Sequence, residues 1–236
     1  PLTLTKVAQP ETPKAPRLRP MLAISRSPLA ALGVVVAALS GASFRMTGPI
    51  FGQQVGLEIT TIAYFLASFV LGGAIAQYPI GFIADKIDRR WVLIWLSFAA
   101  IISCMVTANI NTNNTYILML TAGIFGFTTF PIFSVAAAHA HDFAQDYERV
   151  ELSAALMFFY AVGAIAAPYT ASILMQSFGP SALFYLIAFG HVGLVVFGFY
   201  RMLSRPPVEE KTDYIYSPRT SFLVGRLLKF HHKNNK

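Results

Sequence analysis

The chain has 236 residues, of which 55% are hydrophobic and only 12% charged, and its mean hydropathy is +0.56. A soluble domain carries about twice that charged fraction, so the composition excludes an ordinary soluble protein and predicts an integral membrane protein. The net charge of +7 does not indicate nucleic-acid binding, because the excess of Lys and Arg lies in the loops and tails that flank long apolar runs.

The first 27 residues are predicted to form a basic, proline-rich linker. Prolines at positions 10, 13, 16 and 20 argue against a continuous helix, because proline lacks the N–H that an interior helical turn requires. Five Lys and Arg residues stand in this segment against one acidic residue, Glu11. Because the first residue is Pro1 rather than methionine, we expect that the chain is one part of a longer protein.

Six apolar runs follow, and each is long enough to cross the ~30 Å hydrocarbon core of a bilayer as a helix. The predicted spans are 29–53, 60–84, 91–109, 116–138, 152–176 and 181–200. Residues 28–200 are therefore predicted to form one transmembrane bundle, and residues 201–236 a basic tail. The predicted fold class is all-α integral membrane protein with six transmembrane helices.

The positions of the basic residues predict the orientation of these spans. Of the 18 Lys and Arg residues, 17 lie before the first run, in the segments 85–90 and 139–151, or after the sixth run. The connectors 54–59, 110–115 and 177–180 carry none. Since Lys and Arg concentrate in cytoplasmic loops, both termini and both charged loops are predicted to be cytoplasmic, in a multi-pass protein of the inner (plasma) membrane.

The connection between the second and third runs, residues 81–90 (GFIADKIDRR), is short and highly charged. Gly81 and Asp85 are four residues apart and so share one helix face, where the small Gly81 leaves room for another helix to approach closely. Asp85 places a carboxylate where a neighbouring helix can present its positive N-terminus. Arg89 and Arg90 supply cations for acidic partners across the turn.

These residues resemble the signature loop of the major facilitator superfamily, G-x-x-x-D-[RK]-x-G-R-[RK]. The positions that fit are Gly81, Asp85, Lys86, Arg89 and Arg90. Asp88 stands where the second glycine is usual, and this departure points to the degenerate second copy of the loop, in the C-terminal half of such transporters. The residues QYPIG at 77–81 and AHAHD at 138–142 resemble the YcaD-like branch of the superfamily.

The resemblance implies one half of the superfamily fold, a three-plus-three inverted repeat of helices. It implies the C-terminal half of a secondary active or facilitative transporter, which moves a small solute by alternating access. The implied partners are an N-terminal six-helix half, on the same chain or on another, the lipid bilayer, the small-molecule substrate and a coupling ion. No enzymatic activity, cofactor or nucleic-acid partner is expected.

The two charged loops on the cytoplasmic side are predicted to form salt bridges with each other. The segment 85–90 sums to +1 and the segment 139–151 to −3. The expected partners in the second segment are Asp142, Asp146, Glu148 and Arg149. In the resembled family the signature loop steadies the cytoplasmic gate, and its Asp meets the N-terminus of the fifth helix of the same half. The alternative is that these are ordinary solvated charges.

Four polar residues inside the spans are candidates for the substrate cavity: Arg45, Gln77, Thr128 and Tyr160. Arg45 is the only basic residue within an apolar run, about 24 Å from the start of that run at ~1.5 Å per residue, in the outer third of the membrane. It either binds an anionic group of the substrate or extends to the periplasmic surface. The other three candidates can instead form hydrogen bonds between helices.

Other classes of membrane protein are less compatible with these residues. A serine protease of the rhomboid type needs a Gly-x-Ser-x-Gly loop, and an intramembrane metalloprotease needs His-Glu-x-x-His; neither motif is present. There is also no Walker lysine motif for an ATP-driven pump. His139 and His141 lie about 200° apart on a helix and cannot easily share a metal ion, so no metal site is expected. A receptor or scaffold on the same fold that does not transport remains an alternative.

Overall fold

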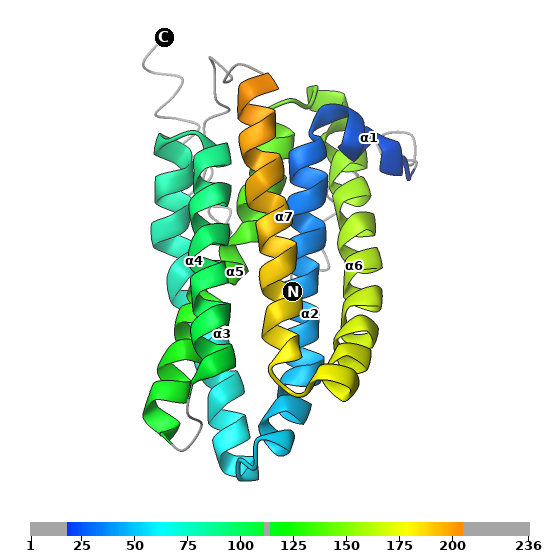
Figure 1. The fold of residues 1–236 in the computed structure, drawn as a ribbon. Helices are drawn as coiled ribbons and strands as arrows, with labels where there is room; N and C mark the ends of the chain where they lie inside the picture. Colours follow the sequence, from blue (N-terminus) through cyan, green and yellow to red (C-terminus); the bar gives the residue numbers. More distant parts are fainter. Residues whose placement is uncertain (1–17, 111–113, 205–236) are drawn as a thin grey trace, which may run out of the picture.

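The computed structural model describes residues 18–110 and 114–204, and these residues form helices joined by short turns (Figure 1). Six of the helices are long and apolar enough to cross a membrane. They are α2 (Pro28–Gln54), α3 (Ile59–Lys86), α4 (Arg89–Asn109), α5 (Thr115–His141), α6 (Arg149–Phe178) and α7 (Ala182–Ser204). Each contains nearly all of one predicted span, so the prediction of an all-α membrane fold with six spanning helices is confirmed.

Local sequence signals set the ends of these helices. Ser27 and Asn114 are N-caps. The side-chain oxygen of Ser27 accepts a hydrogen bond from the backbone N–H of Ala30, at 3.1 Å, and that of Asn114 accepts one from the backbone N–H of Ile117, at 3.2 Å. Asp88 caps α4 in the same way through the backbone N–H of Arg90, at 2.9 Å. The turn after α6 uses Gly179, whose φ of +88° favours glycine. Short connections of this kind place consecutive helices antiparallel.

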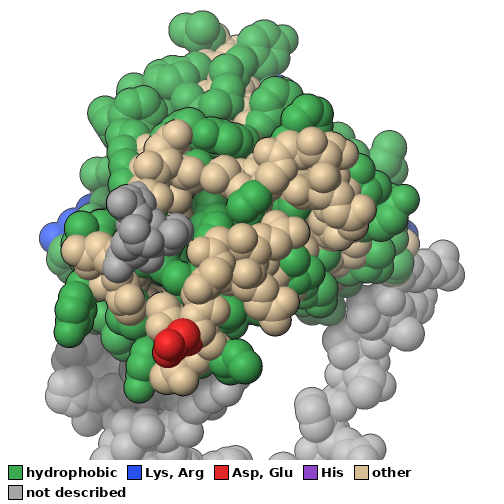
Figure 2. Space-filling model, turned by 60° about the horizontal axis from the view of Figure 1, so that its bottom comes forward, with side chains coloured by type: hydrophobic (Ala, Val, Ile, Leu, Met, Phe, Trp, Pro, Cys, Tyr) green, Lys and Arg blue, Asp and Glu red, His purple; other side chains and the backbone are tan. Residues whose placement is uncertain are grey.

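The bundle has two chemically different ends. We call the end that carries the α3–α4 turn and residues 142–148 the charged end; it is at the top of Figure 1. Figure 2 brings the opposite end forward, where hydrophobic side chains, uncharged side chains and backbone cover most of the described surface, with one small acidic patch and Lys and Arg atoms only at the edges of the view. This separation agrees with the positions of the basic residues in the sequence.

One element was not expected within the predicted linker. Residues Pro20–Arg26 form a short helix, α1, because Pro20 occupies the first helical turn, where no N–H donor is required. Arg19 and Arg26 make ion pairs with Glu151 and Glu148, at 3.3 and 2.6 Å, which hold α1 against the start of α6. The rest of the predicted linker, 1–17, and most of the predicted tail, 205–236, lie outside the described residues.

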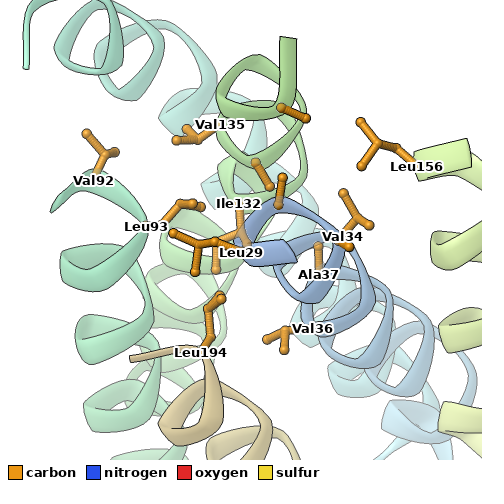
Figure 3. Packing of buried hydrophobic residues seen from close by; sticks show 14 of the residues in the cluster. Leu29, Val34, Val36, Ala37, Val92, Leu93, Ile132, Val135, Leu156 and Leu194 are labelled. Carbon is orange, nitrogen blue, oxygen red and sulfur yellow. The ribbon is translucent and has the colours of Figure 1, made fainter. Parts of the chain in front are cut away.

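Two hydrophobic clusters fill the bundle. One lies toward the charged end and joins aliphatic side chains from α2, α4, α5 and α7, among them Leu29, Leu93, Ile132 and Leu194 (Figure 3). The other lies toward the opposite end and is dominated by phenylalanine rings. Phe44 is at its centre, with ring centroids of four other phenylalanines between 4.2 and 6.3 Å away. Burial of this apolar area positions the polar groups described below.

Glycines set the closest helix contacts. A Cβ atom added at Gly72 of α3 would collide with the backbone oxygen of Gly123 of α5, and one added at Gly126 would collide with the backbone oxygen of Phe69. On the other side of the bundle, a Cβ added at Gly163 of α6 would lie 2.9 Å from the Cβ of Ala38 of α2. Small residues at these positions let the helix backbones approach closely.

The pairing of helices follows a three-plus-three repeat. The most extensive contacts join α3 with α5 and α2 with α6. If α2–α4 are exchanged with α5–α7, each of these two pairs becomes the other. The pairs α4–α5 and α2–α7 are exchanged in the same way, and both are in contact. The contacts are therefore those of two three-helix units related by inverted symmetry.

Candidate functional site

The charged end holds a buried ion pair between two helices. Arg89, at the start of α4, donates to the carboxylate of Asp142, which follows α5, and the side chains of both residues are only 6% exposed. Arg89 also donates to the carbonyl oxygen of Ala138, at 3.5 Å, and to Asp85, at 3.3 Å. One guanidinium thus joins the end of α3, the start of α4 and the end of α5.

The adjacent arginine has a different environment. Arg90 is buried and donates to both carboxylate oxygens of Asp88, at 2.7 to 3.2 Å. Burial alone would raise the pKa of Asp88, but hydrogen bonds from the side chain and backbone of Arg90, with the charges of Arg90 and His139, hold this pKa below its usual value. Asp88 therefore caps α4 and fixes Arg90. This explains an aspartate at the position where the family pattern has glycine.

Three of the expected partners of the signature turn lie elsewhere. Asp146 pairs with Arg149, at 3.1 Å, on the exposed start of α6. Glu148 accepts hydrogen bonds from Arg26 of α1, at 2.6 Å, and from the backbone N–H of Gln145, at 3.1 Å. The expectation that all four residues face the 85–90 turn is therefore wrong for these three. The reason is the local turn before α6: it directs Glu148 toward α1, and it brings Asp146 next to Arg149, the first residue of α6.

Gly81 and Asp85 face a large open pocket instead of a neighbouring helix. Within the described residues no atom lies within 4 Å of a Cβ added at Gly81, so the expected close approach is absent there. The Asp85 side chain is 42% exposed, and the ion pair that holds it runs to Arg89 and not to the N-terminus of α6. Lys86 lies over the ring of Phe82, at 4.0 Å. The pocket has a volume of about 710 Å³ and lies between α3 and α5 at the charged end.

The four candidates for the substrate cavity separate into three places. Gln77 lines the large pocket together with Asp85 and Ser134. Thr128 is buried, and its hydroxyl donates to the carbonyl oxygen of Phe125 within α5, so it supports the helix. Arg45 and Tyr160 come together, from α2 and α6. The structure thus brings only two of the four candidates to one site.

Arg45 donates to the hydroxyl oxygen of Tyr160, at 3.1 Å. Its guanidinium folds back over Gly41, and a Cβ added there would lie 3.2 Å from Nη2. Gly41 lies one turn nearer the charged end than Arg45. The side chain therefore points toward the middle of the bundle and away from the surface that it would reach by extending outward. It adopts the conformation that the cavity alternative expects and not the extended one.

Arg45 and Tyr160 line a cavity of about 70 Å³. Its walls come from α2, α5 and α6, and the lining residues are Ala37, Gly41, Arg45, Thr129, Phe130, Phe133 and Tyr160. Five of them were not predicted as cavity residues from the sequence: Ala37, Gly41, Thr129, Phe130 and Phe133. Thr129 had a signal, since it is adjacent to the polar candidate Thr128, but the two phenylalanines stand among many apolar residues of α5.

The histidines have local partners. His191, on α7, is fully buried, and its Nε2 lies 2.9 Å from the hydroxyl of Ser40 on α2. Nε2 of His141 lies 3.1 Å from the hydroxyl of Ser153. Residues 18–110 and 114–204 contain no group of three or more His, Cys, Asp or Glu side chains that could hold a metal ion. These contacts join helices, as expected for histidines with a structural role.

Comparisons with known proteins agree with the geometry. The chain is 28% identical over 219 residues to the uncharacterized MFS-type transporter Ent638_1421 of Enterobacter sp. (strain 638), covering 92% of this chain and 55% of the relative. It is 29% identical over 190 residues to the uncharacterized MFS-type transporter YcaD of Escherichia coli O17:K52:H18 (strain UMN026 / ExPEC), covering 80% and 48%. The chain therefore spans about half the length of the curated relatives it matches.

A solved structure is similar in fold. It is that of an auto inhibited POT family peptide transporter, and it superposes with a TM-score of 0.62 over 87% of this chain and 45% of its own, at 15% sequence identity. At this identity the likeness shows the fold alone. Residues 30–231 match the family model described as Major Facilitator Superfamily. Since this match covers most of the chain, the chain belongs to the major facilitator superfamily, and its relatives are MFS-type transporters of the YcaD kind.

Proposed function

We propose that this chain is one half of a secondary transporter that moves a small solute across a bilayer by alternating access, by active or facilitated transport. The observation that carries the proposal is the pair formed by Arg45 and Tyr160, a cation turned toward the middle of a six-helix membrane bundle. A charge at such depth faces a partner or a cavity in membrane proteins, and here it lines a cavity. Arg45 then binds an anionic group of the solute.

The cluster around Arg89 serves as the gate at the charged end, which the basic residues orient toward the cytoplasm. Two buried charges and a backbone carbonyl hold α4 and α5 together there. Asp85 is half-exposed and faces the large pocket, so it is free to exchange partners when the transporter changes conformation. A cysteine at Gln77 should react faster with an impermeant thiol reagent added on the cytoplasmic side when Asp85 is replaced by Asn. An unchanged rate contradicts this role for Asp85.

A second six-helix half completes the transporter, from the same chain or from another. In the apolar segment of α3 only 33% is buried within the described bundle, and in that of α6 only 28%. The corresponding share for α2 is 67%. Both helices expose many large apolar side chains. These faces are suited to a second half or to lipid, and transport by this piece alone in liposomes would contradict the need for another half.

The function is tested on the complete protein. A thermal-shift screen of small solutes identifies a ligand, and uptake of that ligand is then measured in proteoliposomes for wild type, Arg45→Gln and the exposed control Arg149→Gln. Arg45→Gln should abolish saturable uptake without unfolding the protein, and the control should transport normally. A protein that binds the ligand but never transports it would instead be a receptor or scaffold. Chemical analysis of the ligand recovered from the proteoliposomes tests for turnover, which the family membership does not lead us to expect.

A further inference from the structure

The polar groups around the small cavity can hold a single anion. Arg45 is exposed to the cavity, and among the described residues it has no carboxylate within ion-pair distance. Tyr160 accepts a hydrogen bond from Arg45, so its own O–H remains free to donate. The guanidinium and the phenol together therefore offer N–H and O–H donors at one place. A cation within a membrane span requires a counter-charge, and a carboxylate supplies both acceptors and charge.

The remaining walls offer little to a polar solute. Thr129 is the only other lining side chain with a hydroxyl, and it already donates to the carbonyl oxygen of Phe125, at 2.8 Å. Ala37 and Gly41 present a smooth surface of α2. A substrate rich in hydroxyl or amino groups would lose its hydrogen bonds to water at these walls without replacement, which weakens its binding. The walls that this half supplies thus disfavour sugars, amino acids and dicarboxylates.

The aromatic rings favour a flat apolar body. Phe133 and Tyr160 are in edge-to-face contact, with ring centroids 5.3 Å apart and planes at 81°. Phe130 forms a further wall from α5. The volume of about 70 Å³ is several times the 10–15 Å³ that one water molecule requires, so a carboxylate and part of a ring can enter. Rings at such an angle accept another ring by stacking or by edge contact.

We propose that the solute bound at this cavity is a monocarboxylate with a flat, apolar body, an inference that rests on the transport function proposed above. The carboxylate lies between Arg45 and Tyr160, and the body lies against Phe130 and Phe133. Because Arg45 is the single cation among the residues that line this cavity, we expect the solute to carry one negative charge. The aromatic walls set the shape and the low polarity of the rest of the molecule.

Four probes separate the parts of this proposal, with affinities measured calorimetrically on the complete protein in lipid nanodiscs. Benzoate has both features, benzamide lacks the charge, lactate lacks the apolar ring, and phthalate carries a second charge. Benzoate should bind about 10- to 100-fold more tightly than benzamide, which is the effect of one charged hydrogen bond. It should also bind at least tenfold more tightly than lactate or phthalate.

Variants assign the affinity to the named residues. Arg45→Gln should weaken benzoate to the level of benzamide, and Arg45→Lys, which keeps the charge, should restore part of the affinity. Phe133→Leu should weaken benzoate about 3- to 10-fold and leave lactate unchanged. Melting temperatures of all variants, measured without ligand, separate loss of binding from loss of folding.

Two results would overturn the proposal. If lactate or phthalate binds and is transported in an Arg45-dependent way while benzoate is not, the substrate class is wrong and the transport function stands. If benzoate and benzamide bind equally, the anion site is wrong. Failure of every solute to be transported, with benzoate still bound through Arg45, would refute the transport function and leave the binding class intact.

Discussion

The buried pair of Arg89 and Asp142 permits a quantitative test of the charged end. Asp142→Asn removes the negative charge and leaves the Arg89 guanidinium buried. Removing one partner of a buried ion pair costs about 3–5 kcal/mol, because the remaining charge is not compensated. Arg89 retains Asp85 at 3.3 Å and the carbonyl oxygen of Ala138 at 3.5 Å. We therefore expect a loss near the lower limit, about 3 kcal/mol.

A matched control lies at the same end of the bundle. Asp146 also pairs with an arginine, Arg149, but its side chain is 94% exposed. Exposed pairs contribute about 0–1 kcal/mol, so Asp146→Asn should change stability by less than that. Both variants make the same chemical change in similar sequence surroundings. The difference between them therefore measures the effect of burial.

The assay is the free energy of unfolding of the purified complete protein in micelles, measured by denaturant titration with the tryptophan fluorescence as signal. A double-mutant cycle with Arg89→Gln then isolates the pair, and we expect a coupling of about 2 kcal/mol, within the range for residues in direct contact. Equal stabilities of Asp142→Asn and Asp146→Asn, or a coupling near zero, would refute the reasoning that this buried pair holds α4 to α5.

Three further predictions concern other parts of the bundle. In thermal melts, Asp88→Ala should destabilise the protein by about 1 kcal/mol more than Asp88→Asn, because asparagine keeps the helix cap. Since the pKa of Asp88 is lowered on folding, the difference in stability between wild type and Asp88→Asn should be full at pH 7 and should disappear as the pH falls below about 4. A difference in stability that does not depend on pH would contradict this. Gly73→Ala should push the Phe130 ring toward the Arg45 cavity and lower the free energy of unfolding by about 1–3 kcal/mol. It should also weaken ligand binding, as measured by calorimetry. An unchanged affinity would contradict the assignment of Phe130 to the cavity wall. Cysteines at Glu58 and Asp146 should react with impermeant reagents from opposite sides of the membrane, and labelling from the same side would contradict the six-span topology.

The membrane fold was predictable because its signals are strong and local. Six apolar runs separated by short polar turns leave few alternatives, and the helix caps stand at the run boundaries. The charged turn was recognisable because Gly81 and Asp85 are one helix turn apart at the end of α3, and Arg89 and Arg90 begin the next helix after two intervening residues. The pairing of Arg89 with Asp142 followed from opposite charges on loops at the same end, which the alternation of spans already placed together.

The cavity was less predictable because α5 and α6 are apolar on all sides. With no polar face, their sequences do not show which side points inward, so Phe130 and Phe133 carried no signal. Gly81 misled for a related reason, because a glycine indicates that a close contact is possible but not where it occurs. The close contacts lie instead at Gly72 and Gly123. Arg45 was identifiable as unusual, but its direction depends on Tyr160 of a distant helix.

Helix α5 connects the two sites. Its middle carries Phe130 and Phe133 at the wall of the small cavity, and its last turn offers the Ala138 carbonyl to Arg89. Pro131 lies between Phe130 and Phe133 and removes one backbone hydrogen bond, so α5 can bend there at lower cost. Release of Arg89 would free the end of α5 beyond Pro131, and bending at this point would displace the aromatic wall. We therefore propose that the Arg89 cluster and the small cavity are coupled through α5, as the alternating access proposed above would require.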